Sequence, residues 1–310
     1  MIMAPVREKA ATAYTLAVDL GATNLRVGLV SLGSDNVPAI VEQVKGPTPE
    51  NDPEALVDKI IADAKEVVSR HPDLKFKTIG VSACGQIADE RTAMFLPNLG
   101  PKVRDVRLAD ALEKAFPFAK CRVANDANAE ALSESTYGAA KDYADSIFVT
   151  ISSGIGTGYV YKHQLINTMM EGGRIIITFD GKLVETEYYL SGNGISRLCQ
   201  ERGLGNLKAY QFFQRLREHD QDPKLVAAYN DWVKYLGCFF GNLQRMFNVD
   251  VYVLSGGVMK SQDVFLKDLL KVSNAYLKPY PLKPVVFLDA KFGQDAGLLG
   301  GAACGFSLEK

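Results

Sequence analysis

Apolar and polar residues are arranged along the chain in blocks that predict strands and helices in turn. Residues 14–19 and 25–32 are two apolar, strand-like runs joined by residues 21–24, so the chain is expected to open with a hairpin. A helix is expected over residues 53–69, because Asp52 is a favoured N-cap and apolar positions then recur at spacings of three and four.

The same alternation continues to the end of the chain. A mostly helical stretch is expected over residues 191–246, where Trp232, Phe239 and Phe240 lie at helical spacing and are expected in the core or a dimer contact. Strands that alternate with helices predict an α/β fold. Further strands are predicted over residues 76–82, 121–125, 146–152, 159–165, 251–255 and 285–288, and further helices over residues 108–116, 127–137, 262–277 and 295–306.

Length predicts the number of domains, and 310 residues indicate about two. No low-complexity linker marks a boundary, which we place after residue 119. The last helix, within residues 295–310, is expected to pack back on the first domain. The expected parts are a flexible leader over residues 1–12, an N-terminal α/β domain over 13–119 and a C-terminal α/β domain over 120–294.

Composition and charge exclude several classes of protein. Hydrophobic residues make up 47% and charged residues 23% of the chain, which is typical of a soluble globular protein. The formal net charge of -1 predicts neither nucleic acid nor an anionic membrane surface as a partner. No run reaches the roughly 18 to 20 apolar residues that a membrane span needs. Five scattered cysteines without C-x-x-C spacing indicate reduced thiols and a cytoplasmic location.

An acidic residue ends the first predicted strand, and a glycine turn follows it. Asp19 precedes Gly21, Thr23 and Asn24. The backbone N–H groups of such a turn can bind a phosphate while the carboxylate orients Mg²⁺. The same D-x-G pattern is also a common hairpin turn, so the segment alone leaves both interpretations open.

Alternate glycines at Gly154, Gly156 and Gly158, with Thr157 among them, follow a later strand. They leave backbone N–H groups accessible to a charged ligand. The segment is not the dinucleotide fingerprint, since Tyr159 stands where a glycine is needed, and it is not a Walker loop, since G-K-[ST] is absent. A flexible hairpin without a ligand is the alternative.

Asn125 and Asp126 come where a predicted strand ends and a helix begins. The carboxyl ends of strands are where α/β sheets hold ligands, and Asp126 could accept the proton of a substrate hydroxyl. The alternative is that Asp126 only caps the helix.

These three segments, in this order, resemble the ROK family of sugar kinases and repressors, within the sugar kinase, Hsp70 and actin superfamily. The resemblance covers nearly the whole chain from residue 14 onward. It implies an α/β, two-domain actin-like ATPase (ribonuclease H-like) fold with the active site in the interdomain cleft. It also implies that Asp126 is the catalytic base and that Asp19 orients Mg²⁺ through water. Nucleotide contacts are implied for the two glycine turns and a later Ser-Gly-Gly segment, at Asp19, Gly21, Thr23, Asn24, Gly154, Gly156, Thr157, Gly158, Gly256 and Gly257.

One region departs from the family pattern. Arg174 replaces the family histidine and no cysteine lies between it and Ser191, so no zinc site is expected. Zinc-free members of the family are known among N-acetylmannosamine kinases. Arg174 is expected to hold Glu187 or Glu171 in an ion pair, or else to bind an acyl carbonyl or an acidic group of the substrate. The residues for which the resemblance implies sugar binding are Gly85, Asn98, Asn125, Glu171, Arg174 and Glu187.

The function implied by the resemblance is ATP- and Mg²⁺-dependent phosphorylation of the 6-hydroxyl of a hexose or N-acetylhexosamine, with N-acetylmannosamine or glucose favoured. A small-molecule sugar is then the partner, and a homodimer is expected. The alternative is a catalytically weak sugar or nucleotide sensor. A repressor would carry a helix-turn-helix before Asp19, where only 18 residues stand.

Overall fold

The structure is a computed structural model that describes residues 12–166 and 169–309. The chain forms two compact units. Unit 1 comprises residues up to 137 together with residues 294–310, and unit 2 comprises residues 138–293. The leader expected over residues 1–12 lies almost wholly outside the described residues. Within the described part of the chain, no helix is long and apolar enough to cross a membrane.

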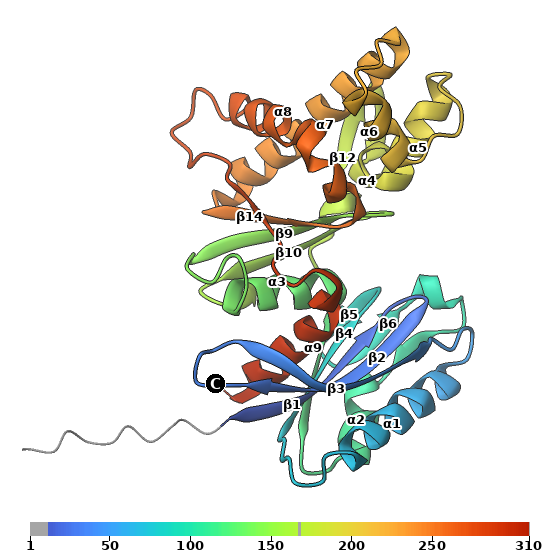
Figure 1. Cartoon of the computed structure of the whole chain (residues 1–310), viewed down its shortest axis with the longest axis vertical. Helices are drawn as coiled ribbons and strands as arrows, with labels where there is room; N and C mark the ends of the chain where they lie inside the picture. Colours follow the sequence, from blue (N-terminus) through green and yellow to red (C-terminus); the bar gives the residue numbers. More distant parts are fainter. Residues whose placement is uncertain (1–11, 167–168, 310) are drawn as a thin grey trace, which may run out of the picture. The chain divides into compact units, whose positions relative to one another are not determined.

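Unit 1 contains a five-stranded sheet with the strand order β3-β2-β1-β4-β8 (Figure 1). The antiparallel β1–β2 hairpin confirms the hairpin predicted at the start of the chain. Strands β1, β4 and β8 run parallel, so their carboxyl ends lie at one edge of the sheet. The strands are β1 (Ala13–Leu20), β2 (Asn24–Leu32), β3 (Pro38–Pro47), β4 (Thr78–Ala83) and β8 (Lys120–Asn125).

Helices cover both faces of this sheet. Helices α1 (Pro53–Ser69) and α2 (Leu108–Ala115) share one apolar core with the sheet. Asp52 caps α1 as predicted, since its carboxylate accepts hydrogen bonds from the N–H groups of Glu54 and Ala55 at 3.1 and 3.0 Å. Helix α9 (Ala296–Phe306) packs against β1, β4 and α3 (Asp126–Thr136).

Glycines let α9 approach the sheet. A Cβ atom at Gly80 of β4 would lie 1.9 Å from the carbonyl oxygen of Gly301 and 2.3 Å from the backbone nitrogen of Gly305. Backbone therefore lies directly on backbone here, which only glycine permits. This contact fixes the second half of α9 against the middle of β4.

The predicted domain boundary after residue 119 is too early. Strand β8 pairs with β4 along its whole length, from Thr78 opposite Lys120 to Ala83 opposite Asn125. Both β8 and α3 thus belong to unit 1, which continues to residue 137. The partner of β8 lies about 40 residues away in the sequence, and such a pairing leaves no local pattern in the chain.

Unit 1 also contains a small three-stranded sheet that the hydrophobic pattern did not predict, and β3 was missed as well. The small sheet carries a 3₁₀ turn, Pro97–Leu99, between its second and third strands. Its strands are only three or four residues long, too short for a periodic signal. They are β5 (Gln86–Ala88), β6 (Thr92–Phe95) and β7 (Arg104–Val106).

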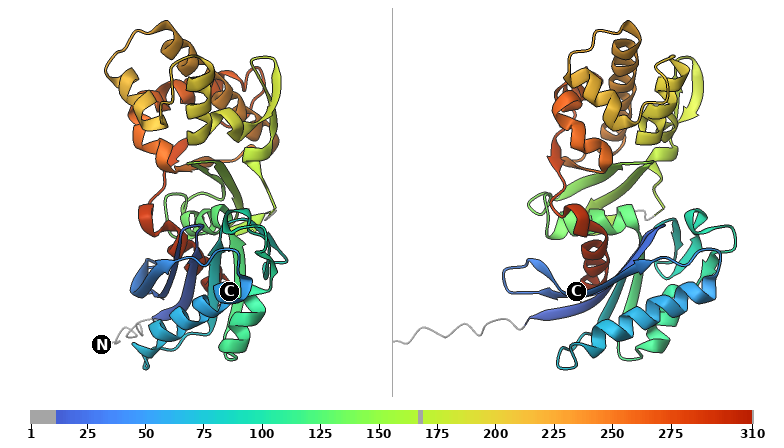
Figure 2. Two further views of the ribbon diagram at one scale, coloured as in Figure 1. Left: turned by 90° about the vertical axis from the view of Figure 1, so that its right-hand side faces the viewer. Right: turned by 45° about the vertical axis from the view of Figure 1, so that its right-hand side comes forward.

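Unit 2 is built on a second five-stranded sheet, with helices gathered on one face (Figure 2). Its strand order is β11-β10-β9-β14-β15. Trp232, Phe239 and Phe240 are at most 1% exposed, which confirms their place in the core. The strands are β9 (Asp145–Ile151), β10 (Ile155–Tyr161), β11 (Gln164–Ile166), β14 (Val251–Ser255) and β15 (Phe287–Asp289). The helices are α4 (Thr186–Leu190), α5 (Gly192–Glu201), α6 (Ala209–Arg217), α7 (Pro223–Phe247) and α8 (Gln262–Ala275), with a separate hairpin of β12 (Ile176–Phe179) and β13 (Lys182–Glu185).

Candidate functional site

Asp19 lies near the carboxyl end of β1 and faces the first turn of α9. A Cβ atom at Gly297 would lie 2.5 Å from the Asp19 carboxylate, so only a glycine fits beside it. Arg26 Nη1 lies 4.0 Å from Asp19 Oδ2, and the same guanidinium donates to the Gln294 carbonyl and to Asp295. Arg26 therefore joins the first hairpin to the start of α9, a role that the sequence did not reveal.

Burial raises the pKa of Asp19 to about 6, and the charge of Asp126 adds to this rise. Arg26 and Lys45 act in the opposite direction. A carboxyl group with these surroundings holds its negative charge more readily when a cation binds beside it.

The turn after Asp19 is the predicted tight hairpin. Gly21 N–H donates to the Asn24 carbonyl at 3.1 Å, and the Thr48 hydroxyl donates to the Gly21 carbonyl at 2.8 Å. Thr23 and Asn24 are exposed at its tip. The turn is thus held by its own backbone and by Thr48, while its polar side chains face solvent.

Asn125, not Asp126, caps helix α3. The Asn125 side-chain oxygen accepts hydrogen bonds from the N–H groups of Ala127 and Asn128 at 3.0 and 3.4 Å. Asp126 is the first residue of the helix, and its Oδ1 accepts from Ala127 N–H at 2.8 Å. Burial raises the pKa of Asp126, which makes its carboxylate a stronger base. Asn125 therefore provides the N-cap of α3, and the helix does not need Asp126 for this purpose.

Asn125 also positions Gly85, one of the residues predicted to bind the sugar. Its Nδ2 donates to the Gly85 carbonyl at 2.9 Å. Gly85 has φ +100°, and a Cβ atom there would lie 2.3 Å from the Phe95 carbonyl oxygen, so glycine is required. Asn98 is exposed in the 3₁₀ turn Pro97–Leu99. Since both ends of the Asn125 amide already bond within the fold, its contact with a substrate stays a prediction, as do those of Gly85 and Asn98.

Glu130 is a site residue that sequence reasoning missed. It lies one helical turn after Asp126 on α3, and its backbone nitrogen packs against Gly300 of α9. Burial and the charges of Asp126 and Asp19 raise the pKa of Glu130 to about 8. The i, i+4 spacing of two acidic residues at the start of a helix was the available signal, because it places both on one face.

The second glycine segment differs in part from its prediction. Strand β10 begins at Ile155, so the turn consists of residues 152–154 and Gly156 to Gly158 lie within the strand. Ser152 N–H donates to the Gly154 carbonyl at 2.9 Å and closes the turn. The expected start of this strand at residue 159 is four residues late. Glycines have no side chains from which an apolar period could be read.

Thr157 is 2% exposed and its hydroxyl accepts a hydrogen bond from Gly172 N–H at 2.9 Å. A Cβ atom at Gly172 would lie 2.5 Å from the Thr157 methyl group. The Thr157 side chain is therefore packed inside unit 2, and the nucleotide contact predicted for Thr157 stays a prediction.

Glu187, from helix α4, lies against the second glycine turn. Its Oε2 accepts from Ile155 N–H at 3.0 Å, and its Oε1 lies 3.0 Å from Arg174 Nη1. The expected Arg174–Glu187 ion pair is thus present, and Arg174 Nη1 also donates to Glu185 at 2.6 Å. Glu171 is exposed just before the 3₁₀ turn that carries Arg174. The sequence did not indicate that Glu185 also pairs with Arg174.

The Ser-Gly-Gly segment follows β14, whose carboxyl end lies beside that of β9. Gly256 has φ +101°, and a Cβ atom there would lie 2.3 Å from the Ile151 carbonyl oxygen, whereas a Cβ atom at Gly257 would meet nothing within 4 Å. Gly192, the first residue of α5, donates its N–H to the Ser152 carbonyl at 2.7 Å. In unit 2 the structure therefore brings Gly154, Gly256 and Glu187 to one edge of the sheet.

The family resemblance implies a Mg²⁺ ion beside Asp19. Carboxylate oxygens are the ligands that Mg²⁺ prefers, and the raised pKa values of Asp19 and Asp126 fit a place where a cation offsets negative charge. Among residues 12–166 and 169–309, no group of three or more His, Cys, Asp or Glu could hold a metal by itself. Orientation of a hydrated Mg²⁺ by Asp19 stays a prediction.

The ROK family model matches residues 15–305, and the chain belongs to the ROK family. It is 28% identical over 316 residues to a glucokinase of Halalkalibacterium halodurans, covering 93% of each chain. Among solved structures it is similar to a ROK hexokinase from Thermus thermophilus, with a TM-score of 0.81, 26% identity and coverage of 96% and 99%. The chain has the actin-like two-domain ATPase fold of ROK sugar kinases.

Two further relatives bear on activity. A ROK family glucokinase from Streptomyces griseus, solved in complex with glucose and AMPPNP, gives a TM-score of 0.71 and 25% identity, covering 95% of this chain and all of that one. The xylose repressor of Bacillus subtilis is 25% identical over 301 residues, covering 93% of this chain and 75% of the repressor. Kinases and repressors are therefore both present among its relatives.

Proposed function

We propose that this protein is an ATP- and Mg²⁺-dependent kinase that phosphorylates the 6-hydroxyl of a hexose or N-acetylhexosamine. The observation that carries the proposal is Asp126, a partly buried carboxylate with a raised pKa that lies at the carboxyl end of the parallel strands, where Asn125 provides the N-cap of the helix. Its relatives include glucokinases and a ROK hexokinase.

In the proposed reaction Asp126 accepts the proton of the 6-hydroxyl as the hydroxyl oxygen bonds to the γ-phosphorus and the bond to ADP breaks. The raised pKa of Asp126 favours this proton transfer. Mg²⁺, when bound, offsets charge on the phosphates. Asp19 orients its water shell, and Arg26 limits how far the Asp19 carboxylate can turn.

Residues of unit 2 supply binding in this proposal. The backbone of the turn at Gly154 and the segment Gly256–Gly257 contact the nucleotide, while Glu187 and Glu171 contact the sugar. Arg174 and Ile155 N–H hold the Glu187 carboxylate in one orientation, which lowers the entropy lost on binding. The expectation that the active site lies in a cleft between the domains stays a prediction.

The test is a coupled ADP-release assay with Mg-ATP against glucose, mannose, fructose, N-acetylglucosamine and N-acetylmannosamine, with Asp126→Asn as the control. Turnover on one sugar that is lost in the variant is the expected result, with glucose and N-acetylmannosamine the favoured substrates. Turnover on no sugar, together with stabilisation by a sugar on heating, would support the sensor alternative instead.

A homodimer and a cytoplasmic location are part of the same proposal and rest on the family resemblance and on the scattered cysteines. Within the described residues, Cys84, Cys121, Cys199, Cys238 and Cys304 are all unpaired thiols. Light scattering of the purified chain tests the dimer directly.

A further inference from the structure

Ser82, near the carboxyl end of β4 in unit 1, carries a buried hydroxyl without a hydrogen-bond partner. Its side chain is 0% exposed, and its Oγ bonds to no group among residues 12–166 and 169–309. A buried hydroxyl without a partner costs free energy, so native structures retain few of them and each needs an explanation. Because Ser82 is fully covered, a ligand does not contact it directly, and a function of this hydroxyl has to act through a neighbouring residue.

The sheet places Ser82 beside Asp19. Asp19 of β1 is paired with Arg26 of β2 on one side and with Ser82 of β4 on the other. Paired residues of neighbouring strands point to the same face of a sheet, and the strands lie about 4.8 Å apart. The three side chains therefore form one row, in which the carboxylate lies between the guanidinium and the hydroxyl.

The Asp19 carboxylate contacts α9 and Arg26 and leaves Ser82 without a bond. Arg26 Nη1 lies 4.0 Å from Asp19 Oδ2, and a Cβ atom at Gly297 would lie 2.5 Å from the carboxylate. In the described part of the chain, neither the Asp19 carboxylate nor the Ser82 hydroxyl takes part in a hydrogen bond. An acceptor and a donor thus start from adjacent positions of the sheet without bonding to each other.

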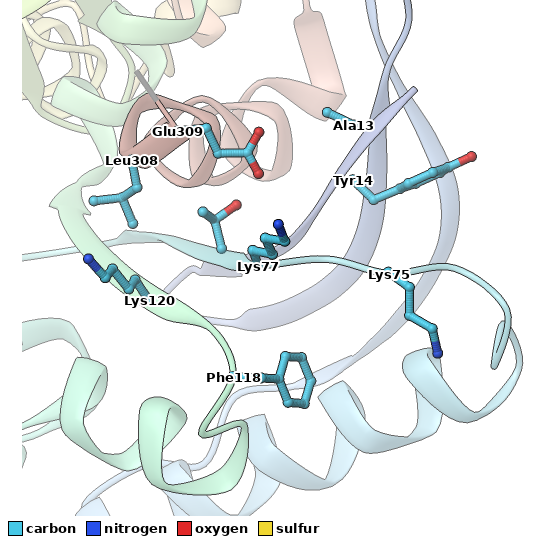
Figure 3. A pocket seen from close by; sticks show the side chains of 9 residues that line it. Ala13, Tyr14, Lys75, Lys77, Phe118, Lys120, Leu308 and Glu309 are labelled. Carbon is cyan, nitrogen blue, oxygen red and sulfur yellow. The ribbon is translucent and has the colours of Figure 1, made fainter. Parts of the chain in front are cut away.

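The other end of the same two strands shows such a bond formed. Thr15 and Thr78 directly precede the first paired residues of β1 and β4. The Thr78 hydroxyl donates to Thr15 Oγ1 at 2.9 Å, and Thr15 Oγ1 donates to the Thr78 carbonyl at 2.9 Å. Thr78 also lines a cavity of about 630 Å³ at that end of the sheet (Figure 3), which Ser82 does not line. Side chains on these neighbouring strands therefore reach each other without a backbone movement, and rotation about Cα–Cβ bonds is the change that a bond from Ser82 to Asp19 requires.

We propose that Ser82 is a positioning residue of the candidate site, whose hydroxyl donates a hydrogen bond to the Asp19 carboxylate in the state that binds Mg²⁺ and nucleotide. The inference rests on the proposed function, because it concerns the task of Asp19 in that function. A hydrogen bond to a charged acceptor is stronger than one between neutral groups, so this bond fixes the orientation of the carboxylate. Arg26 and Ser82 then hold Asp19 from both sides.

The proposed role predicts different effects on stability for two buried hydroxyls of the same pair of strands. In the ligand-free protein the Ser82 hydroxyl has no bond to lose, so Ser82→Ala is expected to melt at or above the wild-type temperature. Thr15→Val is the matched control, because it removes a bonded hydroxyl at a residue that is also 0% exposed. It is expected to lower the melting temperature by about 3 °C.

The experiment is isothermal titration calorimetry of the full chain with ADP, once in Mg²⁺ and once in EDTA. Ser82→Ala is expected to weaken binding in Mg²⁺ about tenfold and to leave binding in EDTA unchanged, because Asp19 acts on the cation. Thr15→Val is expected to bind ADP like the wild type in both solutions. Ser82→Cys keeps a weak donor and should give an intermediate affinity. In Asp19→Asn, adding Ser82→Ala should cause no further loss, because the two residues act as one unit.

Wild-type affinity of Ser82→Ala for ADP in Mg²⁺ would overturn the proposal. A loss of melting temperature as large as that of Thr15→Val would overturn it too, because the hydroxyl would then have a structural partner. Equal losses of affinity in Mg²⁺ and in EDTA would contradict an action through Asp19. Sugar-dependent ADP release by the wild type tests the kinase proposal separately, and its presence together with any of these results would refute the role of Ser82 alone.

Discussion

The candidate residues of the two units differ in how the fold satisfies their charges. In unit 1, Asp19, Asp126 and Glu130 are acids whose pKa values are all raised by burial. In unit 2, the Glu187 carboxylate is already bonded to Ile155 N–H and to Arg174.

This difference separates two tasks. Partly buried acids with raised pKa values change charge readily when a cation or a proton arrives, which is what general-base catalysis beside Mg²⁺ requires. A carboxylate fixed by backbone and guanidinium changes little and serves as a rigid contact for a ligand. Unit 1 would therefore carry the chemistry and unit 2 the recognition.

The largest expected effect is on turnover. Asp126→Asn should lower kcat by about a thousand-fold, because the amide cannot accept the hydroxyl proton. The helix keeps its Asn125 cap, so the melting temperature should stay close to the wild-type value. Steady-state ADP release and thermal unfolding of the same preparation measure both. An Asp126→Asn enzyme with the wild-type kcat would show that Asp126 is not the catalytic base.

A smaller effect is expected on stability, at the contact that places α9 beside Asp19. Gly80→Ala should lower the free energy of unfolding by about 3 kcal/mol, because its Cβ would overlap the backbone of Gly301 and Gly305. Gly257→Ala in unit 2 is the control, and it should change stability by less than about 0.5 kcal/mol, since its Cβ meets nothing. Urea unfolding measures both, and equal stabilities would contradict the close packing of α9.

The ion pair of unit 2 should matter for binding and less for turnover. Arg174→Ala is expected to raise KM for the sugar about tenfold with a smaller change in kcat, because Glu187 loses one of its two fixed partners. Arg217→Ala removes a similar exposed pair, with Asp263, and serves as the control. If kcat fell in Arg174→Ala while KM stayed constant, the pair of Arg174 and Glu187 would not serve sugar binding.

A pH dependence of stability is expected from Glu130. Its pKa of about 8 lies above the value in the unfolded chain, so the folded state retains a proton that the unfolded state releases. Stability from this group is full below about pH 4 and is lost as pH rises to 8. Glu130→Gln should therefore be equal to the wild type in stability at pH 4 and more stable than it at pH 8.5.

Urea unfolding across this pH range measures the difference, with Glu66→Gln on the exposed face of α1 as the control. Parallel curves for the wild type and Glu130→Gln would show that Glu130 has the same pKa in the folded and the unfolded chain, which would contradict the rise caused by burial.

Local signals predicted much of this protein. The hairpin at the start of the chain, the capped helix α1, the core position of Trp232 and the pairing of Arg174 with Glu187 all follow from residues close in sequence or from a family motif. The short strands β5 to β7 were missed because three residues show no period. The burial of the Thr157 side chain could not be predicted, because a sequence does not show which side of a strand is covered.

The sequence by itself determined the class of fold, the family motifs and the type of chemistry, because periodicity, caps and glycine turns are local properties of the chain. Only the tertiary structure decided that β8 and α3 belong to unit 1, that Gly297 lies against Asp19 and that Glu130 joins the acids of the site. These facts depend on contacts between residues up to about 280 positions apart. Burial and electrostatic coupling arise only when such segments pack together, and they set the pKa values on which the proposed chemistry rests.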